Sequence, residues 1–310
     1  MYVTWKIVIS IYIVLLIFAD HIGGGGYPQA VYDQVRALFQ GNDALILILG
    51  TWFVGLGAYV ISNIPFVLLD LFHPEWVQKY RVQDPDAGIK VTAAELLSAM
   101  KVNSINILIV NPLAASGMYL LHQMMGGKGL GGYLTFDTSP ELPSLRTALL
   151  QLPVMLAGAE IGFYYSHKWL HDPSIYKYIH KVHHTWNRPS SIMSVYAHPI
   201  EYFLGNILPI FWGSVFMGSH IFVAWCFSVF ITWHTTSVHS GYHLPLITPS
   251  PEFHDHHHRV FGECFGTFGF LDKYHGTCST FLKSVQYQRH YTILSIKSAR
   301  ELHPDAKKSK

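Results

Sequence analysis

Residues 152–184 read LPVMLAGAEIGFYYSHKWLHDPSIYKYIHKVHH. The apolar run of which they are part, Leu145 to Tyr165, is long enough to span a bilayer, and it leads directly into two histidine clusters. The first cluster has the pattern H-x-x-x-H (His167 and His171), and the second has the pattern H-x-x-H-H (His180, His183 and His184). The stretch therefore predicts a transmembrane helix that ends at a metal site.

The same two patterns recur further along the chain, as HSGYH from His239 to His243 and as HDHHH from His254 to His258. Residues at i, i+3 and i+4 share one face of a helix, so each cluster presents its imidazoles in one direction. Ten imidazoles are too many for one ion and suit two. The predicted ligands are His167, His171, His180, His183, His184, His239, His243, His254, His257 and His258.

The ligand type narrows the choice of metal. Imidazole binds iron, zinc, copper and nickel, whereas a structural zinc site closes with four ligands. The three cysteines, Cys226, Cys264 and Cys278, are far apart and form neither a thiolate pair nor a disulfide scaffold. An all-imidazole site in apolar surroundings favours two non-haem iron ions, although zinc would bind the same ligands.

The composition is that of a membrane protein. Half of the 310 residues are hydrophobic and 13% are charged, against about a quarter charged in soluble domains. The net charge of +2 is too small to indicate a nucleic-acid partner.

Four segments are predicted to cross the bilayer: Val3–Ala19, Ala44–Phe72, Val102–Leu121 and Leu145–Tyr165. The first of these has the alternative of a signal sequence. A further apolar stretch, Pro199–Trp233, is predicted to be a membrane-inserted helical hairpin that returns to the side it came from. The distribution of Lys and Arg places the N-terminus, the charged segment 75–101 and everything after Ser166 in the cytosol.

The expected fold is thus an all-α integral membrane protein with about four transmembrane helices, the hairpin and a cytosolic, helical, histidine-rich cap. We expect an N-terminal transmembrane region at 1–143, a catalytic region at 144–285 and a polar, basic tail at 286–310.

Three carboxylates are candidates for hydrogen bonds to the ligand rings. Glu160 lies inside the fourth span, seven residues before His167, and Asp255 and Glu201 lie close to other clusters. An ordinary polar contact is the alternative for each. The spacing of His234 and His256 turns them away from the neighbouring ligands, and His220 is expected at the turn of the hairpin.

Two longer strings carry a family resemblance: YKYIHKVHHTWNRPSSIMSVYAHPIE from residue 176 and HSGYHLPLITPSPEFHDHHHRVFGECFGTFGFLDKYHGT from residue 239. They resemble the fatty acid hydroxylase superfamily, which includes C4-methylsterol oxidases, sterol C5-desaturases and sphingolipid fatty-acid 2-hydroxylases. The resemblance implies a di-iron, oxygen-using enzyme of the endoplasmic reticulum membrane. It assigns the ten histidines above as ligands, brings His198 close to the metals and makes His275 a candidate there. His256 departs from the family, whose members usually have an aromatic residue at this position.

The resemblance also implies a lipid substrate and electrons from cytochrome b5 and NAD(P)H through a separate reductase. The leading hypothesis is oxidation of a 4-methylsterol at the C4 methyl group. Hydroxylation or desaturation of a fatty acyl or sphingolipid chain is the alternative, and a non-catalytic membrane regulator of lipid metabolism is an alternative of another class. The terminal KKSK resembles a dilysine retrieval signal of the endoplasmic reticulum.

Overall fold

The computed structural model describes residues 26–83, 91–127, 132–186, 190–246 and 249–305. The described part is built of helices, with two isolated bridges in place of a sheet. Four helices are long and apolar enough to cross a membrane: Asp43–Phe72, Ala93–Met124, Leu145–Leu170 and Ile221–His239. The all-α membrane fold predicted from the sequence is confirmed. The predicted span Val3–Ala19 and the KKSK tail lie outside the described residues.

Two of these long helices each contain a wider π-helical turn. The first consists of α3 (Asp43–Leu45), the π-helix η1 (Ile46–Gly50) and α4 (Thr51–Phe72). The second consists of α6 (Ala93–Ile105), the π-helix η3 (Asn106–Val110) and α7 (Asn111–Met124). Both are longer than a bilayer crossing needs, so they extend beyond the hydrocarbon region.

The second long helix corrects one predicted boundary, because it begins at Ala93 and not at Val102. Its start is fixed by a capping box. The Thr92 hydroxyl accepts a hydrogen bond from the Glu95 N–H (3.2 Å), and the Glu95 carboxylate accepts one from the Thr92 N–H (2.8 Å). The final part of the charged segment 75–101 is therefore helical, after the short helix α5 (Glu75–Gln78).

The predicted hairpin is present. Its first arm is α10 (Pro199–Glu201), the π-helix η6 (Tyr202–Ile207) and α11 (Leu208–Phe216), and its second arm is α12 (Ile221–His239). His220 lies at the turn, as expected, where its side chain caps α12 and its ring contacts the Ser139 carbonyl at 3.0 Å. The second arm runs beyond the predicted end at Trp233 and is long enough to cross a membrane alone.

The first arm of the hairpin packs closely against α8 (Leu145–Leu170). A Cβ atom on Gly213 would lie 2.6 Å from the Met155 Cα, and one on Gly158 would lie 2.9 Å from the Gly213 backbone nitrogen. Small residues at helix crossings allow this approach in membrane proteins.

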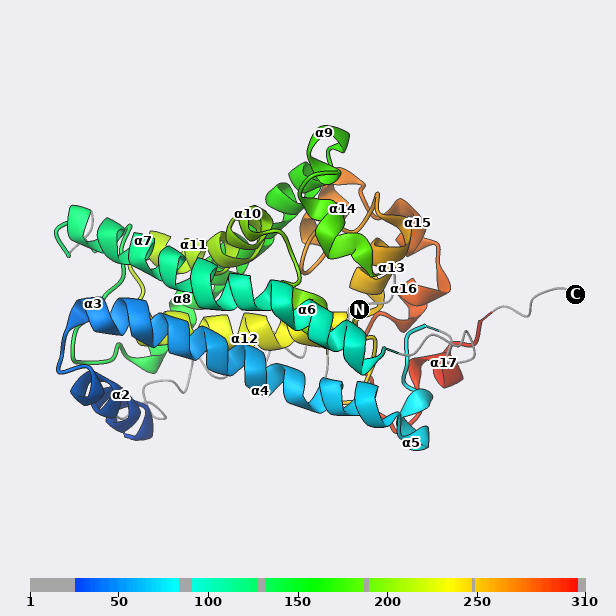
Figure 1. Cartoon of the computed structure of the whole chain (residues 1–310), viewed down its shortest axis with the longest axis horizontal. Coiled ribbons are helices and arrows are strands. Elements are labelled where there is room, and N and C mark those ends of the chain that lie inside the picture. Colours follow the sequence, from blue (N-terminus) through cyan, green and yellow to red (C-terminus); the bar gives the residue numbers. More distant parts are fainter. Residues whose placement is uncertain (1–25, 84–90, 128–131, 187–189, 247–248, 306–310) are drawn as a thin grey trace, which may run out of the picture.

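The long helices lie side by side along the longest axis of the molecule, with α2 (Tyr27–Leu38) at one end (Figure 1). Short helices gather at the other end and form what we call the cap. They are α9 (Pro173–Tyr176), the 3-10 helix η4 (His180–Thr185), α13 (Glu252–Val260), α14 (Phe270–His275), α15 (Ser279–Leu282), α16 (Val285–Arg289) and α17 (Ala299–Leu302). A further 3-10 helix, η5 (Ser191–Val195), packs against α12 and α4.

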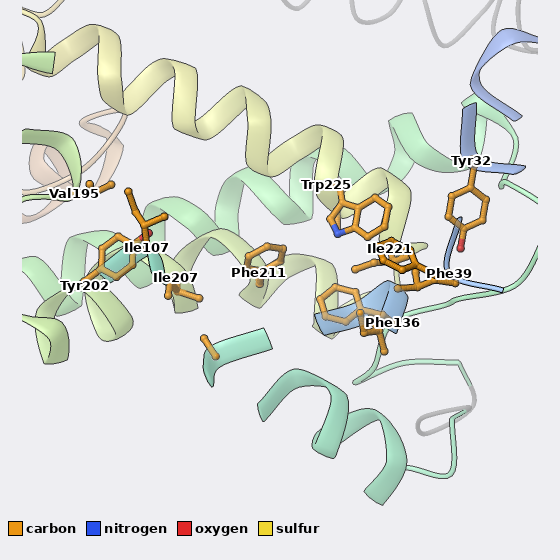
Figure 2. Close-up of a cluster of buried hydrophobic side chains, with 14 of the residues drawn as sticks. Tyr32, Phe39, Ile107, Phe136, Val195, Tyr202, Ile207, Phe211, Ile221 and Trp225 are labelled. Atoms are coloured by element: carbon orange, nitrogen blue, oxygen red, sulfur yellow. The ribbon is translucent and has the colours of Figure 1, made fainter. Parts of the chain in front are cut away.

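The hydrophobic core of the bundle is rich in aromatic side chains near the hairpin turn (Figure 2). The Phe136 and Phe211 rings meet edge to face, with centroids 6.1 Å apart. Trp225 covers Gly50 and donates from its indole N–H to the Thr51 hydroxyl at 2.9 Å. By contrast, large apolar side chains such as Ile61 and Leu113 are exposed on the outside of the long helices, as expected of a surface that lipid covers.

Candidate metal centre

Nine of the ten predicted histidine ligands gather into two groups at the junction of the long helices and the cap. The five-histidine cluster contains His167, His171, His180, His184 and His257. The four-histidine cluster contains His183, His239, His254 and His258. Within each cluster, one ring nitrogen from every residue lies within 4.8 Å of all the others.

The local helices distribute the rings between the clusters. His167 lies in the last turn of α8 and His171 is its C-terminal cap, and both point to the five-histidine cluster. Along η4 and along α13, successive clustered histidines belong to alternate clusters, because adjacent residues of a helix point in different directions. His183 and His258 therefore belong to the four-histidine cluster, whereas their neighbours His184 and His257 belong to the five-histidine cluster. Each H-x-x-H-H motif therefore supplies both clusters, which corrects the expectation that a motif presents all its imidazoles in one direction.

The distances between the inward-facing nitrogens match ligands that share one ion. In the five-histidine cluster the Nε2 atom of His180 lies 2.9 Å from that of His171 and 3.0 Å from that of His184. In the four-histidine cluster the corresponding distances are 2.8 Å from His254 to His239 and 3.0 Å from His254 to His258. Two nitrogens that bind one ion at about 2.1 Å and at right angles lie about 3.0 Å apart.

Backbone carbonyls hold several of these rings by their other nitrogen. The Nδ1 atom donates to a carbonyl oxygen from His167 (to Phe265, 2.8 Å), His257 (to Glu263, 2.7 Å), His183 (to Tyr196, 3.2 Å) and His239 (to Thr235, 2.7 Å). Since a carbonyl only accepts, Nδ1 carries the proton and Nε2 presents a lone pair in each neutral ring. This is the arrangement that orients imidazoles toward a metal.

One pair shows directly that the donor set fits a cation. His183 and His239 both use Nδ1 as a donor, and their Nε2 atoms face each other at 3.5 Å. Two lone pairs cannot form a hydrogen bond and repel each other unless a positive charge lies between them. The residues of the four-histidine cluster therefore fit a bound metal ion.

Burial keeps the cap histidines neutral. It lowers the pKa of His183 to about 4 and, with a contribution from His183, the pKa of His171 to about 3. Burial and then the neighbouring histidines also lower the pKa of His180, His184, His254, His257 and His258. A metal ligand must be unprotonated, so these environments favour metal binding near neutral pH.

The structure brings His243 into neither cluster. Its Nε2 atom donates to the Tyr291 carbonyl at 2.9 Å, and its Nδ1 atom lies 3.6 Å from Glu252. The H-x-x-x-H spacing fails here because α12 ends at His239 and Gly241 turns the chain at a φ of +73°. His198 also lies outside both clusters, where its ring caps α10 by accepting from the Ile200 N–H at 3.2 Å.

Two of the three candidate carboxylates, Glu160 and Asp255, do not contact a ligand ring in the way predicted. Glu160 contacts no ligand ring and instead accepts from four backbone N–H groups of the loop 267–271, at Thr267, Phe268, Phe270 and Leu271. Asp255 contacts Gln83, Gln286 and Arg259. Glu201 is the carboxylate that meets a ligand ring, with Oε1 2.7 Å from Nδ1 of His180.

The remaining histidines have other surroundings. The two ring nitrogens of His256 contact Gln286 and Thr280, so it lies outside both clusters, near Glu263 and Cys264. The exposed ring of His275 stacks on Tyr164, with centroids 5.2 Å apart.

A cavity of about 250 Å³ leads from the membrane region to the four-histidine cluster. Small and apolar side chains such as Ala114, Ala115 and Ile210 line its inner part, and His239 and His254 border it at the cap. Members of the five-histidine cluster do not appear among the described lining residues. The two clusters therefore differ in access, and the four-histidine cluster faces the cavity.

Comparison with known proteins agrees with this arrangement. The sequence profile of the family described as fatty acid hydroxylase matches residues 152–277. Fatty acid hydroxylase domain-containing protein 2 of Homo sapiens is 34% identical over 294 residues, which cover 92% of this chain and 83% of the human protein. The chain belongs to the fatty acid hydroxylase family.

Other members of the fatty acid hydroxylase family carry the names of different lipid-modifying enzymes. Methylsterol monooxygenase 2-2 of Arabidopsis thaliana is 28% identical over 252 residues, 76% of this chain and 87% of that protein. Very-long-chain aldehyde decarbonylase GL1-11 of Oryza sativa subsp. indica is 34% identical over 158 residues, 47% of this chain and 58% of that protein. No solved structure matches the chain. Family membership, the apolar helices and the histidine clusters together identify a lipid-acting membrane oxidoreductase with a metal-binding site.

Proposed function

We propose that the protein is a non-haem di-iron oxygenase that oxidises a C–H bond of an apolar lipid, and that its substrate is a 4-methylsterol oxidised at the C4 methyl group. The observation that carries the proposal is the meeting of the four-histidine cluster with an apolar cavity that begins among the long helices. A lipid can enter such a cavity from the bilayer without passing through water.

The histidine clusters, the cap and the cavity would have different roles in such an enzyme. The nine clustered histidines would hold two ions, and the backbone carbonyls of Phe265, Glu263 and Tyr196 keep the rings in the tautomer that binds metal. Bound iron would supply the activation of dioxygen, with electrons from cytochrome b5 and NAD(P)H through a separate reductase. The buried cap excludes water from the ring nitrogens, and the cavity orients the lipid.

The sterol substrate is the finer part of the proposal, and similarity to methylsterol monooxygenases supports it. The methylsterol monooxygenase 2-2 similarity extends over 76% of this chain, well beyond the histidine motifs. Very-long-chain aldehyde decarbonylase GL1-8 of Oryza sativa subsp. indica also matches 76% of this chain, at 30% identity, so coverage does not separate the two reactions and the choice between them requires the mass profile described next. We further propose an endoplasmic reticulum membrane location with the cap on the cytosolic side, as the charge distribution indicates.

The test is a sterol and sphingolipid mass profile of cells that lack their own C4-methylsterol oxidase. The cells express the intact chain, the variant His183→Ala/His184→Ala, which removes one ligand from each cluster, or the control Lys181→Ala at an exposed residue of the same helix. We expect 4-methylsterols to disappear with the intact chain and with Lys181→Ala, and to persist with the double variant.

Two outcomes would contradict parts of the proposal. Persistence of 4-methylsterols with the intact chain, together with a new hydroxylated acyl species, would replace the sterol by an acyl or sphingolipid substrate. Clearance of 4-methylsterols by the double variant would contradict a metal-dependent oxygenase and favour the non-catalytic regulator.

A further inference from the structure

Two histidines that the metal clusters do not use, His234 and His290, line the cavity. His234 lies on α12, five residues before His239, and its side chain lines the cavity. Five residues of α-helix rise about 7.5 Å, so His234 is about one and a half turns from the metal-cluster end of the cavity. Its position is therefore within reach of a lipid whose reacting carbon lies beside His239.

The ring of His234 has no hydrogen-bond partner in the described part of the chain. Nδ1 is buried and unpartnered, and the ring packs edge-on against Phe268 with centroids 5.5 Å apart. By contrast, His290, which lines the same cavity, contacts the Ser250 hydroxyl at 3.0 Å. Buried polar groups in native proteins are nearly always hydrogen-bonded, so an unpartnered imidazole in an apolar cavity indicates a ligand that supplies the partner.

The rest of the lining restricts the chemistry of that ligand. Among the described residues that border the cavity there is no Asp, Glu, Lys or Arg. Away from the metal ion that the four-histidine cluster would hold, a carboxylate or phosphate on the ligand would therefore be buried without a cationic partner, which is strongly unfavourable. A neutral hydroxyl can both donate to and accept from an imidazole, and it suits a cavity that is lined by apolar and uncharged polar side chains.

We propose that His234 binds a hydroxyl group of the substrate and that this hydroxyl lies next to the carbon that reacts at the four-histidine cluster. The substrate class is then a neutral, hydroxylated lipid and not a free fatty acid. This inference rests on the proposed oxygenase function and adds to it the residue that selects and orients the lipid. In a 4-methylsterol the hydroxyl at C3 adjoins C4, so the sterol substrate meets the requirement.

The test measures binding without turnover. The full-length protein in lipid nanodiscs, kept free of reductant, is titrated with two matched pairs of probes: a 4,4-dimethylsterol and its 3-deoxy analogue, and a long-chain alcohol and the corresponding alkane. The variant is His234→Phe, which keeps a ring against Phe268 but cannot form a hydrogen bond. The control is His275→Phe, the same change at an exposed histidine outside the cavity.

We expect His234→Phe to weaken binding of the 3-hydroxysterol at least 10-fold and to change binding of the 3-deoxy analogue less than about twofold, a difference of about one lost hydrogen bond. His275→Phe should change neither. Retained binding of the deoxy analogue also shows that the variant is folded, and His234→Leu repeats the comparison if the phenylalanine variant does not accumulate.

The probe pairs separate this inference from the sterol proposal. Selective loss of the long-chain alcohol alone would support the role of His234 and contradict the sterol. Equal losses for the hydroxylated and deoxygenated members of a pair, or no loss, would overturn the role of His234 even if 4-methylsterols are the substrate. Failure of the intact protein to bind either hydroxylated probe would overturn it as well.

Discussion

The carboxylate of Glu201 lies 2.7 Å from Nδ1 of His180, and both side chains are almost completely buried. The other carboxylate oxygen of Glu201 has no partner among the described residues. A buried carboxylate with a single hydrogen bond stays ionised only if a positive charge lies nearby, and a metal ion bound by His180 would supply one. The contact therefore joins the first arm of the hairpin to the five-histidine cluster and is consistent with a cation held by His180.

Removing this contact should weaken metal binding. Glu201→Ala is expected to lower the affinity of the five-histidine cluster about 10- to 100-fold, the usual effect of losing a partner of a metal-bound imidazole. Glu201→Gln, which retains an acceptor oxygen, should have a smaller effect. The measurement is metal content during titration with a chelator, and Glu75→Ala, at an exposed carboxylate, is the matched control. Identical chelator curves for Glu201→Ala and Glu75→Ala would contradict a role in metal binding.

The position of His243 gives a second prediction, because the family resemblance assigns this residue as a metal ligand whereas the structure places it in neither cluster. Because its Nε2 atom is bonded to the Tyr291 carbonyl, His243→Ala should leave two ions per chain, whereas His183→Ala should lose the ion of the four-histidine cluster. Elemental analysis of the purified variants gives the metal content directly. Loss of one ion in His243→Ala would show that this ring swings inward to bind metal.

Glu160 gives a third prediction. Its carboxylate accepts hydrogen bonds from four backbone N–H groups of the loop 267–271. Just before this loop, the Phe265 carbonyl accepts a hydrogen bond from His167. Glu160→Gln keeps the shape but places an NH2 group against N–H donors, so it should lower the free energy of unfolding by about 1–3 kcal/mol. Thermal unfolding in detergent measures the loss, and Gln123→Glu at the bundle surface controls for an exchange of amide and carboxylate. An unchanged midpoint in Glu160→Gln would show that the loop does not depend on the charge.

The contacts of Glu160 and Glu201 could not be predicted from the sequence. Glu160 shares a helix face with His167, but seven residues of helix separate them by about 10.5 Å, too far for a hydrogen bond. Glu201 reaches His180 only because the hairpin folds back onto the cap, and no local pattern encodes that packing. The histidine clusters were predictable because their spacing is local. His243 was not, since a single helix end at His239 and the turn at Gly241 redirect it.

The membrane helices were predictable from hydropathy, while their ends were less so. The start of α6 at Ala93 was available from the Thr92 and Glu95 capping box, a signal that the charged composition of segment 75–101 obscured. α12 extends to His239 and packs against α4, and hydropathy alone did not indicate either feature.

The buried histidines give a fourth prediction, on pH. In the folded protein the pKa is lowered to about 4 at His183 and to about 3 at His171, whereas histidines of an unfolded chain have a pKa of about 6.5. Below pH 6.5 the unfolded chain binds protons that the folded chain does not, so the stability of the metal-free protein should fall as the pH falls. Each such histidine contributes a loss of up to about 1.4 kcal/mol per pH unit until the pH reaches its folded pKa.

The measurement is chemical unfolding of chelator-treated protein between pH 7.5 and 4.5. His183→Gln removes one titrating ring and should flatten the pH dependence. A stability that rises or stays constant as the pH falls would contradict the lowered pKa values.

The crossing of α8 and α11 gives a fifth prediction. A Cβ atom on Gly213 would meet the Met155 Cα at 2.6 Å and the Val154 carbonyl oxygen at 2.7 Å, and backbone atoms cannot move aside as a flexible side chain can. Gly213→Ala should therefore separate the two helices and destabilise the protein by about 1–3 kcal/mol. Gly117→Ala is the matched control, because a Cβ atom there meets nothing within 4 Å on another membrane helix. It should be neutral or stabilise the helix by up to about 1 kcal/mol, since alanine is the better helix former. Thermal midpoints in the same detergent compare the two substitutions, and equal midpoints would mean that the two helices are not held in close contact at Gly213.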